Sequence, residues 1–121
     1  MRAELKRLDS ADAPEGLASF RPADPENFVL PVGAVIGPAE MPSEELFYFT
    51  VCTAAWLGAN PPEKAFTFLR HYVLLSRWDY SVLERAIGDL CRRTEGQDWA
   101  EVAAKLSRYG AWEFEDYRES N

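Results

Sequence analysis

The side chains that most often carry catalysis are few in this sequence of 121 residues. His71 is the single histidine and lies between Arg70 and Tyr72, in a stretch that we expect to be a strand. A nucleophilic triad needs a base beside its nucleophile, and no G-x-S-x-G elbow accompanies this histidine. The sequence also contains no glycine-rich phosphate motif. It therefore predicts no catalytic residue and no bound cofactor.

The two cysteines, Cys52 and Cys91, lie 39 positions apart and form no C-x-x-C pair. With a single histidine beside them, they cannot provide a zinc site of the usual ligand spacing. Their number and spacing do not fit a disulfide framework either. We therefore expect no metal site, two buried free thiols and a reducing compartment.

Paired carboxylates are the remaining residues that could do chemistry. Glu44 and Glu45, or Glu113, Glu115 and Asp116, could act as the acid and base of a glycosidase. Exposed tryptophans could add a sugar-binding platform, and the chain has Trp56, Trp78, Trp99 and Trp112. Runs of acids are usually solvated, however, and Trp99 and Trp112 fall where apolar surface must be buried. A small acidic α+β enzyme or carbohydrate-binding domain therefore stands as the alternative function.

The acidic residues are unevenly distributed along the chain, which has a formal net charge of −7. Between Asp9 and Glu45 there are eight acids and one base, and residues 112–117 interleave acids with aromatics. An acidic surface repels the phosphates of nucleic acid and attracts a positively charged protein. We therefore expect a basic protein partner and no direct nucleic-acid binding. The candidate contacts are Asp24, Glu26, Glu44, Glu45, Glu113, Glu115, Asp116 and Tyr117.

Proline placement divides the chain, because all eight prolines fall at or before position 62. Alternating apolar residues predict strands at residues 1–6 and 28–36, separated by a loop rich in Pro, Gly and acids at 10–27. β-Branched and aromatic residues predict further strands at 46–52 and 66–77. A helical turn around Trp56 and Leu57 is expected between the last two strands.

The second part of the chain is expected to hold two helices. Asp79 can cap a helix with an apolar stripe through Leu83, Ile87, Leu90 and Cys91. Asp98 with Glu101 forms a capping-box pattern before a second helix, whose buried face includes Trp99 and Tyr109 and whose end is Gly110. Residues 112–117 are expected to be extended.

These elements predict a single α+β domain over residues 1–121, with strands and loops in 1–77 and helices and a terminal segment in 78–121. The architecture is two-layered, with a four-stranded, mainly antiparallel sheet and both C-terminal helices on one face. The charged first ten residues exclude a signal peptide, and no apolar run is long enough to span a membrane. We therefore expect a cytoplasmic protein without a membrane partner.

The residues that carry a family resemblance lie along almost the whole chain. They include Ile36-Gly37-Pro38, Trp78-Asp79-Tyr80 and above all the terminal stretch from Leu106 through Gly110 to Trp112-Glu-Phe-Glu-Asp-Tyr117. In these motifs the chain resembles the Immunity protein 8 family of bacterial polymorphic toxin systems. It departs from the family pattern at Pro31 and Gly33, which interrupt the second predicted strand and put its length in question.

The resemblance implies a cytoplasmic antitoxin that binds and inactivates a toxin encoded beside it, without chemistry of its own. Immunity families are paired with varied toxin domains, many of them nucleases. An acidic inhibitor would suit the basic cleft of a nuclease.

Overall fold

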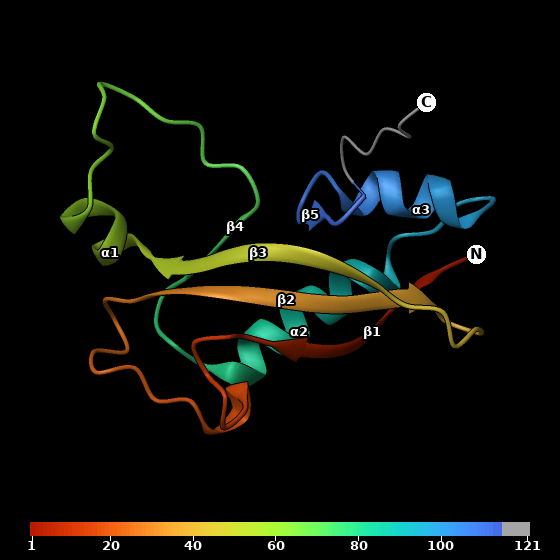
Figure 1. Ribbon diagram of the computed structural model, residues 1–121, viewed down its shortest axis with the longest axis horizontal. Helices are drawn as coiled ribbons and strands as arrows, with labels where there is room; N and C mark the ends of the chain where they lie inside the picture. The colour runs from red at the N-terminus through yellow and green to blue at the C-terminus, as the bar shows by residue number, and fades with distance from the viewer. Residues whose placement is uncertain (115–121) are drawn as a thin grey trace.

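The computed structural model describes residues 1–114, and these form an α+β fold built on one mixed sheet (Figure 1). The sheet has the order β1-β2-β3-β4, and a short fifth strand also pairs with β3. Its strands are β1 (Ala3–Asp9), β2 (Val29–Pro38), β3 (Glu45–Thr53), β4 (Tyr72–Leu75) and β5 (Ala111–Trp112). The helices are α1 (Ala54–Ala59), α2 (Tyr80–Arg92) and α3 (Trp99–Leu106), with a 3-10 turn η1 at Leu17–Ser19.

The antiparallel β2–β3 pair is the centre of the sheet, with partners running from Val29 opposite Cys52 to Ile36 opposite Glu45. Alternate side chains of these strands point to one face and are almost completely buried there. They belong to the same core as the buried residues of α2 and α3, so both helices pack against this core. The inward side chains of the two strands are Leu30, Val32, Ala34, Ile36, Phe47, Phe49 and Val51.

β2 runs unbroken for ten residues, so the two departures from the family pattern do not shorten it. The carbonyl of Phe28 accepts a hydrogen bond from the Thr53 N–H at 3.3 Å, so the backbone groups of Phe28 face β3. Successive residues of a strand point their backbone groups to alternate sides, so the nitrogen of Pro31 points away from β3. β1 pairs with β2 only as far as Gly33. Pro31 therefore lies beyond the end of β1, where its missing N–H removes no bond from the sheet.

The fourth strand is much shorter than the sequence predicted. β4 pairs in parallel with β3 from Tyr72 opposite Thr50 to Leu75 opposite Thr53, and β3 ends there. Residues 61–70 are all exposed and lie outside the sheet, so the prediction of a strand over 66–77 is wrong at both ends. The edge of β3 has room for only four residues at this point, because β5 pairs with the same edge at Phe47 and Tyr48.

His71 lies just before β4, outside the strand in which the sequence placed it. Its backbone is left-handed, with a φ of 62°, and its carbonyl accepts from the Thr50 N–H at 2.9 Å. The imidazole Nε2 lies 3.0 Å from the carbonyl oxygen of Ser107. The side chain therefore joins the loop before β4 to the end of α3.

Both predicted caps are confirmed. The Asp79 carboxylate accepts from the N–H groups of Ser81 and Val82 at the start of α2. The Asp98 carboxylate accepts from the Glu101 N–H at 2.9 Å, and Glu101 reaches back to the N–H of Gln97 at 3.0 Å. A shorter predicted turn is also present, since α1 begins at the cap residue Thr53 and contains Trp56 and Leu57.

The end of α3 differs from the prediction in two respects. The helix ends at Leu106, so Tyr109 lies beyond it and is half exposed instead of joining the buried face. Gly110 is buried, and a Cβ atom there would lie 2.6 Å from the ring of Phe49. The glycine is therefore needed for close packing against β3.

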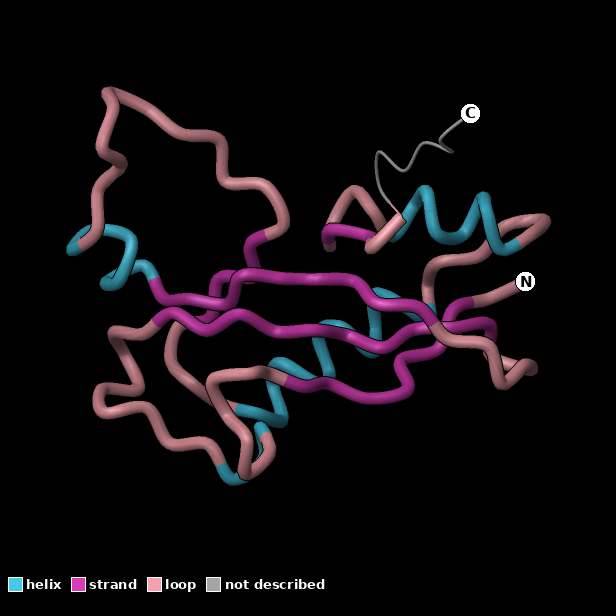
Figure 2. The backbone as a smooth tube through the Cα atoms, in the orientation of Figure 1, coloured by secondary structure: helices cyan, strands magenta, loops and turns pink. Residues whose placement is uncertain are grey.

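Two long loops extend from the same end of the sheet (Figure 2). One contains residues 10–28 and leads into β2, and the other contains residues 60–71 and connects α1 to β4. The opposite end holds the start of β3, the end of β2 and, through the Arg2–Glu95 bridge, the connection between α2 and α3.

Candidate functional site

Three of the predicted contact residues gather at the start of β3. Glu44 precedes β3, Glu45 is its first residue and pairs with Ile36, and Glu113 directly follows β5. The backbone N–H of Glu113 donates to the Leu46 carbonyl at 3.0 Å, and the Leu46 N–H donates to its Oε1 at 3.1 Å. The tertiary fold therefore joins residues that are 67 positions apart in the sequence.

Glu45 is held by two tryptophans. The indole Nε1 groups of Trp99 and Trp112 both donate to its Oε1 atom at 2.8 Å. Both indoles pack against the core, and the ring of Trp112 stacks on Phe47 with centroids 6.4 Å apart. The carboxylate thus has neutral donors for partners, and its negative charge is not balanced by a cation in this contact.

The other predicted contacts are not part of this group. Asp24 and Glu26 lie in the loop before β2, near the end of the sheet where Val29 pairs with Cys52. Seven residue steps along the strand separate that pair from Ile36 and Glu45, a length of roughly 23 Å. Glu115, Asp116 and Tyr117 lie outside the described residues.

We call the group around the start of β3 the acidic end. One of its carboxylates has a cationic partner, since Glu44 forms an ion pair of 3.4 Å with Arg7. Asp98 joins the group through the next residue, Trp99, which donates to Glu45. Glu40 lies in the connection from β2 to β3 at the same end. The acidic end is defined as Glu40, Glu44, Glu45, Asp98 and Glu113.

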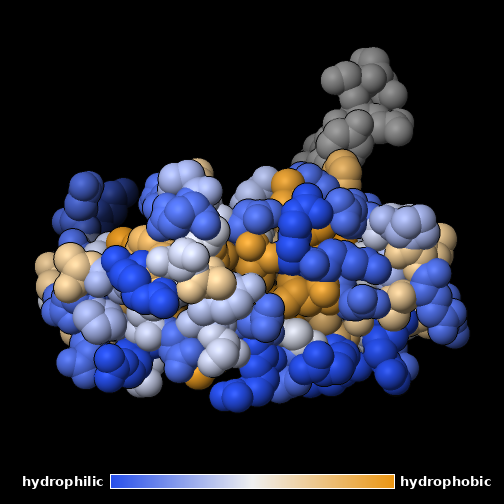
Figure 3. All heavy atoms as spheres, turned by 90° about the horizontal axis from the view of Figure 1, so that it is seen from below, coloured by the Kyte–Doolittle hydropathy of each residue, from blue (hydrophilic) through white to orange (hydrophobic). Residues whose placement is uncertain are grey.

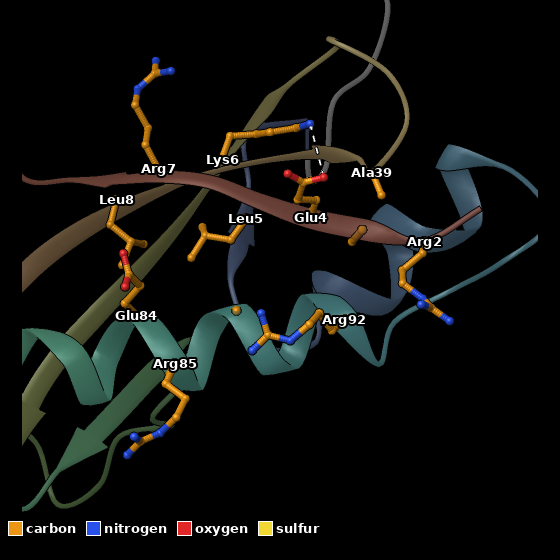
Figure 4. A pocket seen from close by; sticks show the side chains of 12 residues that line it. Arg2, Glu4, Leu5, Lys6, Arg7, Leu8, Ala39, Glu84, Arg85 and Arg92 are labelled. Carbon is orange, nitrogen blue, oxygen red and sulfur yellow. Dashed lines mark ion pairs between the residues drawn. The ribbon is translucent and has the colours of Figure 1, made fainter.

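A second surface feature is a groove of about 650 Å³ between the free edge of β1 and α2. Figure 3 looks at the side on which β1 lies and shows a strip of hydrophobic residues between rows of hydrophilic ones. In Figure 4, Leu5 and Leu8 point from β1 toward α2, and Glu84 and Arg92 project from the helix beside them. Arg7 points away from the helix.

The charges around this groove have both signs and are largely paired. Arg92 forms an ion pair with Asp89 on the same helix. Lys6 lies 3.8 Å from Glu4, and its amino group also donates to two backbone carbonyls. Five bases and two acids of the described residues line the groove, and four of those bases form an ion pair with a carboxylate, so its positive charge is largely balanced.

The loop that replaces the predicted strand at 66–71 forms a third feature. Phe66, Phe68 and Leu69 are among the most exposed large hydrophobic residues in the described part of the chain. The sequence contained a signal for this loop in Asn60-Pro61-Pro62, which is typical of irregular structure. The aromatic and β-branched residues that follow instead predicted a strand.

The tryptophans do not form the exposed platform that the alternative function requires. Trp78 is buried, with its indole N–H donating to the Phe20 carbonyl at 3.1 Å. Trp56 is half buried, and Trp99 and Trp112 are engaged with Glu45. This removes the structural support for a sugar-binding surface built on exposed tryptophans.

Thiols and acidic side chains are the remaining groups that could react or bind a metal ion. Cys52 and Cys91 are free and buried, as predicted, and burial raises the pKa of Cys91 to about 12. Burial also raises the pKa of Cys52. Within residues 1–114, no group of three His, Cys, Asp or Glu side chains is placed to hold a metal ion.

The fold and these surfaces define a small α+β protein whose described features suit binding to a partner. The chain belongs to the Immunity protein 8 family, whose model matches residues 3–117. This membership supports a role as an immunity protein in a toxin system. Searches of curated proteins and of solved structures gave no match. No helix within the described residues is long and apolar enough to cross a membrane.

Proposed function

We propose that this chain binds the toxin domain encoded beside it and blocks that domain without carrying out a reaction of its own. Membership of the Immunity protein 8 family over residues 3–117 is the observation that carries this proposal. The binding acts in the cytoplasm of the producing cell. Affinity in the nanomolar range or better is expected, because a lethal activity must be held inactive at low concentration.

The acidic end is the first contact surface that we propose. Glu45 and Glu113 accept hydrogen bonds from neutral N–H groups, so their negative charges are fixed in position without a balancing cation in these contacts. Such a surface favours a toxin domain with a basic cleft, for example a nuclease. The carboxylates would then occupy the place of the phosphates of the substrate.

Co-expression tests the function. Cells that produce the neighbouring effector domain should survive when this chain is present and die when it is absent. Calorimetry with a catalytically inactive effector domain should give a nanomolar dissociation constant. An absence of both rescue and binding would refute the antitoxin role.

Association kinetics test the surface. The double variant Glu44→Gln with Glu113→Gln keeps one oxygen of each side chain but removes two charges from the acidic end. We expect it to slow association with the effector domain and to weaken the salt dependence of the rate, because opposite charges steer the encounter.

The matched control is Asp24→Asn with Glu26→Gln, which removes two charges from the far end of the sheet. It should leave the association rate unchanged. If only the control variant slows association, the contact surface lies in the loop before β2 instead. If neither salt nor either double variant changes the association rate, the acidic residues serve solubility and do not steer binding.

A further inference from the structure

The loop from residue 60 to residue 71 exposes more apolar side chain than folding of the chain requires. Phe66 is 68%, Phe68 82% and Leu69 51% exposed. The two phenylalanine rings contact each other edge to face, with centroids 5.8 Å apart. Single exposed apolar residues are common, but a contiguous group of this kind marks an interaction site.

Both ends of this loop are attached to the sheet and the helices. At its start, the Asn60 amide donates to the Trp56 carbonyl of α1 at 2.9 Å. At its end, His71 bonds to β3 through its carbonyl and approaches Ser107 through its ring. The phenylalanines are therefore presented from a segment whose ends have fixed positions.

A hollow of about 680 Å³ lies beside the phenylalanines, between α1, the loop and β4. Trp56 and Leu57 of α1, Leu69 of the loop and Tyr72 of β4 line it. Its only charged lining residues in the described part of the chain are one acid and one base, Glu63 and Lys64. The hollow thus suits an apolar side chain of a partner.

The hollow continues into a smaller cleft of about 260 Å³, since Leu69 and Tyr72 line both. Arg93, which caps the end of α2, and Arg108 after α3 line this cleft, and no Asp or Glu of the described residues does. Neither guanidinium has an ion pair within 4 Å in residues 1–114. Both arginines therefore lack a carboxylate partner among the described residues. The cleft thus suits an anionic group.

We propose that these neighbouring features form one docking surface for the toxin domain, which we call the Phe-Arg surface: Phe66, Phe68, Leu69, Tyr72, Arg93 and Arg108. It fits a protein segment that presents an apolar side chain next to a carboxylate. The apolar group enters the hollow beside Phe66, and the carboxylate meets the arginines. The proposal rests on toxin binding as proposed above, but it does not depend on the acidic end.

A protein partner is favoured over nucleic acid by the composition of the surface. Three of its six residues are exposed or partly exposed phenylalanine and leucine side chains, and only two carry positive charge. Nucleic acid is held by a row of cations along the phosphates, which this surface lacks. Aromatic residues and arginine, by contrast, are the residues enriched where protein interfaces concentrate their binding energy.

The test is calorimetry with the inactivated effector domain of the neighbouring toxin gene as the probe. Phe66→Ser with Phe68→Ser should weaken binding at least thirty-fold, which is about 2 kcal/mol. Arg93→Glu with Arg108→Glu should weaken it more than the corresponding Gln variants. All these side chains are exposed, so the melting temperatures should stay at the wild-type value.

Two matched variants serve as controls. Met41→Ser removes an exposed apolar side chain at the other end of the sheet, and Arg92→Gln removes the arginine next to Arg93. Both should bind the probe as the wild type does.

The outcomes separate the two proposals. If the wild-type chain does not bind the probe, the toxin-binding function fails and this inference fails with it. If the wild type binds and the phenylalanine variant binds equally well, the Phe-Arg surface alone is refuted. It is also refuted if sedimentation shows a wild-type dimer that the phenylalanine variant abolishes while affinity for the probe is unchanged. In that case the surface would bind a second copy of the chain.

Discussion

Trp99 and Trp112 donate their indole N–H groups to the same carboxylate oxygen, Oε1 of Glu45, at 2.8 Å each. One indole starts α3 and the other lies in β5, so this single oxygen connects three elements of the fold. Glu45 was predicted from the sequence as a contact for a partner. The structure gives the same side chain a role in holding the helix and the last strand in position.

Replacing Glu45 tests this structural role. Glu45→Ala removes the acceptor for two half-buried N–H groups, so we expect the free energy of unfolding to fall by about 1–3 kcal/mol. Glu45→Gln keeps an acceptor oxygen and should have a smaller effect. Urea unfolding measures both, and a double-mutant cycle with Trp99→Phe should reveal coupling between the two residues. An unchanged unfolding midpoint in Glu45→Ala would contradict this role.

Trp112→Ala should act mainly through stability. The substitution removes a ring stacked on Phe47 together with one of the two bonds to Glu45, and we expect a loss of about 3 kcal/mol. Trp112→Phe should cost less, because it keeps the stacking. Thermal unfolding is the measurement. A variant that kept the wild-type melting temperature and lost toxin binding would place Trp112 in the interface instead.

Gly110→Ala should destabilise the protein by overpacking. The new Cβ atom would meet the Phe49 ring at 2.6 Å, and the expected cost is about 1–3 kcal/mol. Gly58→Ala is the control, because the space around Gly58 is open and alanine favours the helix α1. Combining Gly110→Ala with Phe49→Leu should recover part of the loss. Equal melting temperatures for the two alanine variants would show that Gly110 is not closely packed.

The Asp79 cap should make stability depend on pH in the acid range. The hydrogen bond from the Ser81 hydroxyl and the bonds from the backbone N–H groups lower the pKa of Asp79 in the folded state. The contribution of the ionised Asp79 carboxylate to the free energy of unfolding is therefore complete above the pKa of the unfolded state, about 3.9. It is lost as the pH falls through the lower pKa of the folded state. The melting temperatures of wild type and Asp79→Ala should differ near neutral pH and converge below pH 4. A constant difference across this range would contradict the assignment.

Cys91 should be unreactive in the folded protein. Burial raises the pKa of its thiol to about 12, so at pH 8 almost none of it is the reactive thiolate. We expect a thiol reagent to modify Cys91 only as fast as the chain unfolds, and urea should accelerate the reaction. Cys52→Ser isolates the signal of Cys91. Rapid modification of the native Cys52→Ser variant would show that the site opens without unfolding.

The sequence determined the features whose signals lie within a few residues of one another. The capping carboxylates Asp79 and Asp98 bond to N–H groups two or three residues later, and their helices begin where the pattern predicts. The alternation over residues 28–36 likewise marked the buried face of β2 correctly. The terminal motif through Trp112 was sufficient to indicate the family, which the match over residues 3–117 confirms.

Only the tertiary structure decided which distant residues meet. Phe66 and Phe68 alternate like a strand, yet a strand needs an unpaired neighbouring edge, and the edge of β3 is shared between β4 and β5. The register of β2 against β3 likewise puts Glu45 at one end of the sheet and Glu26 near the other, although both are acids in the same stretch of sequence. Hydrogen bonds between strands and contacts between remote side chains depend on how the elements pack together, and local spacing does not contain that information.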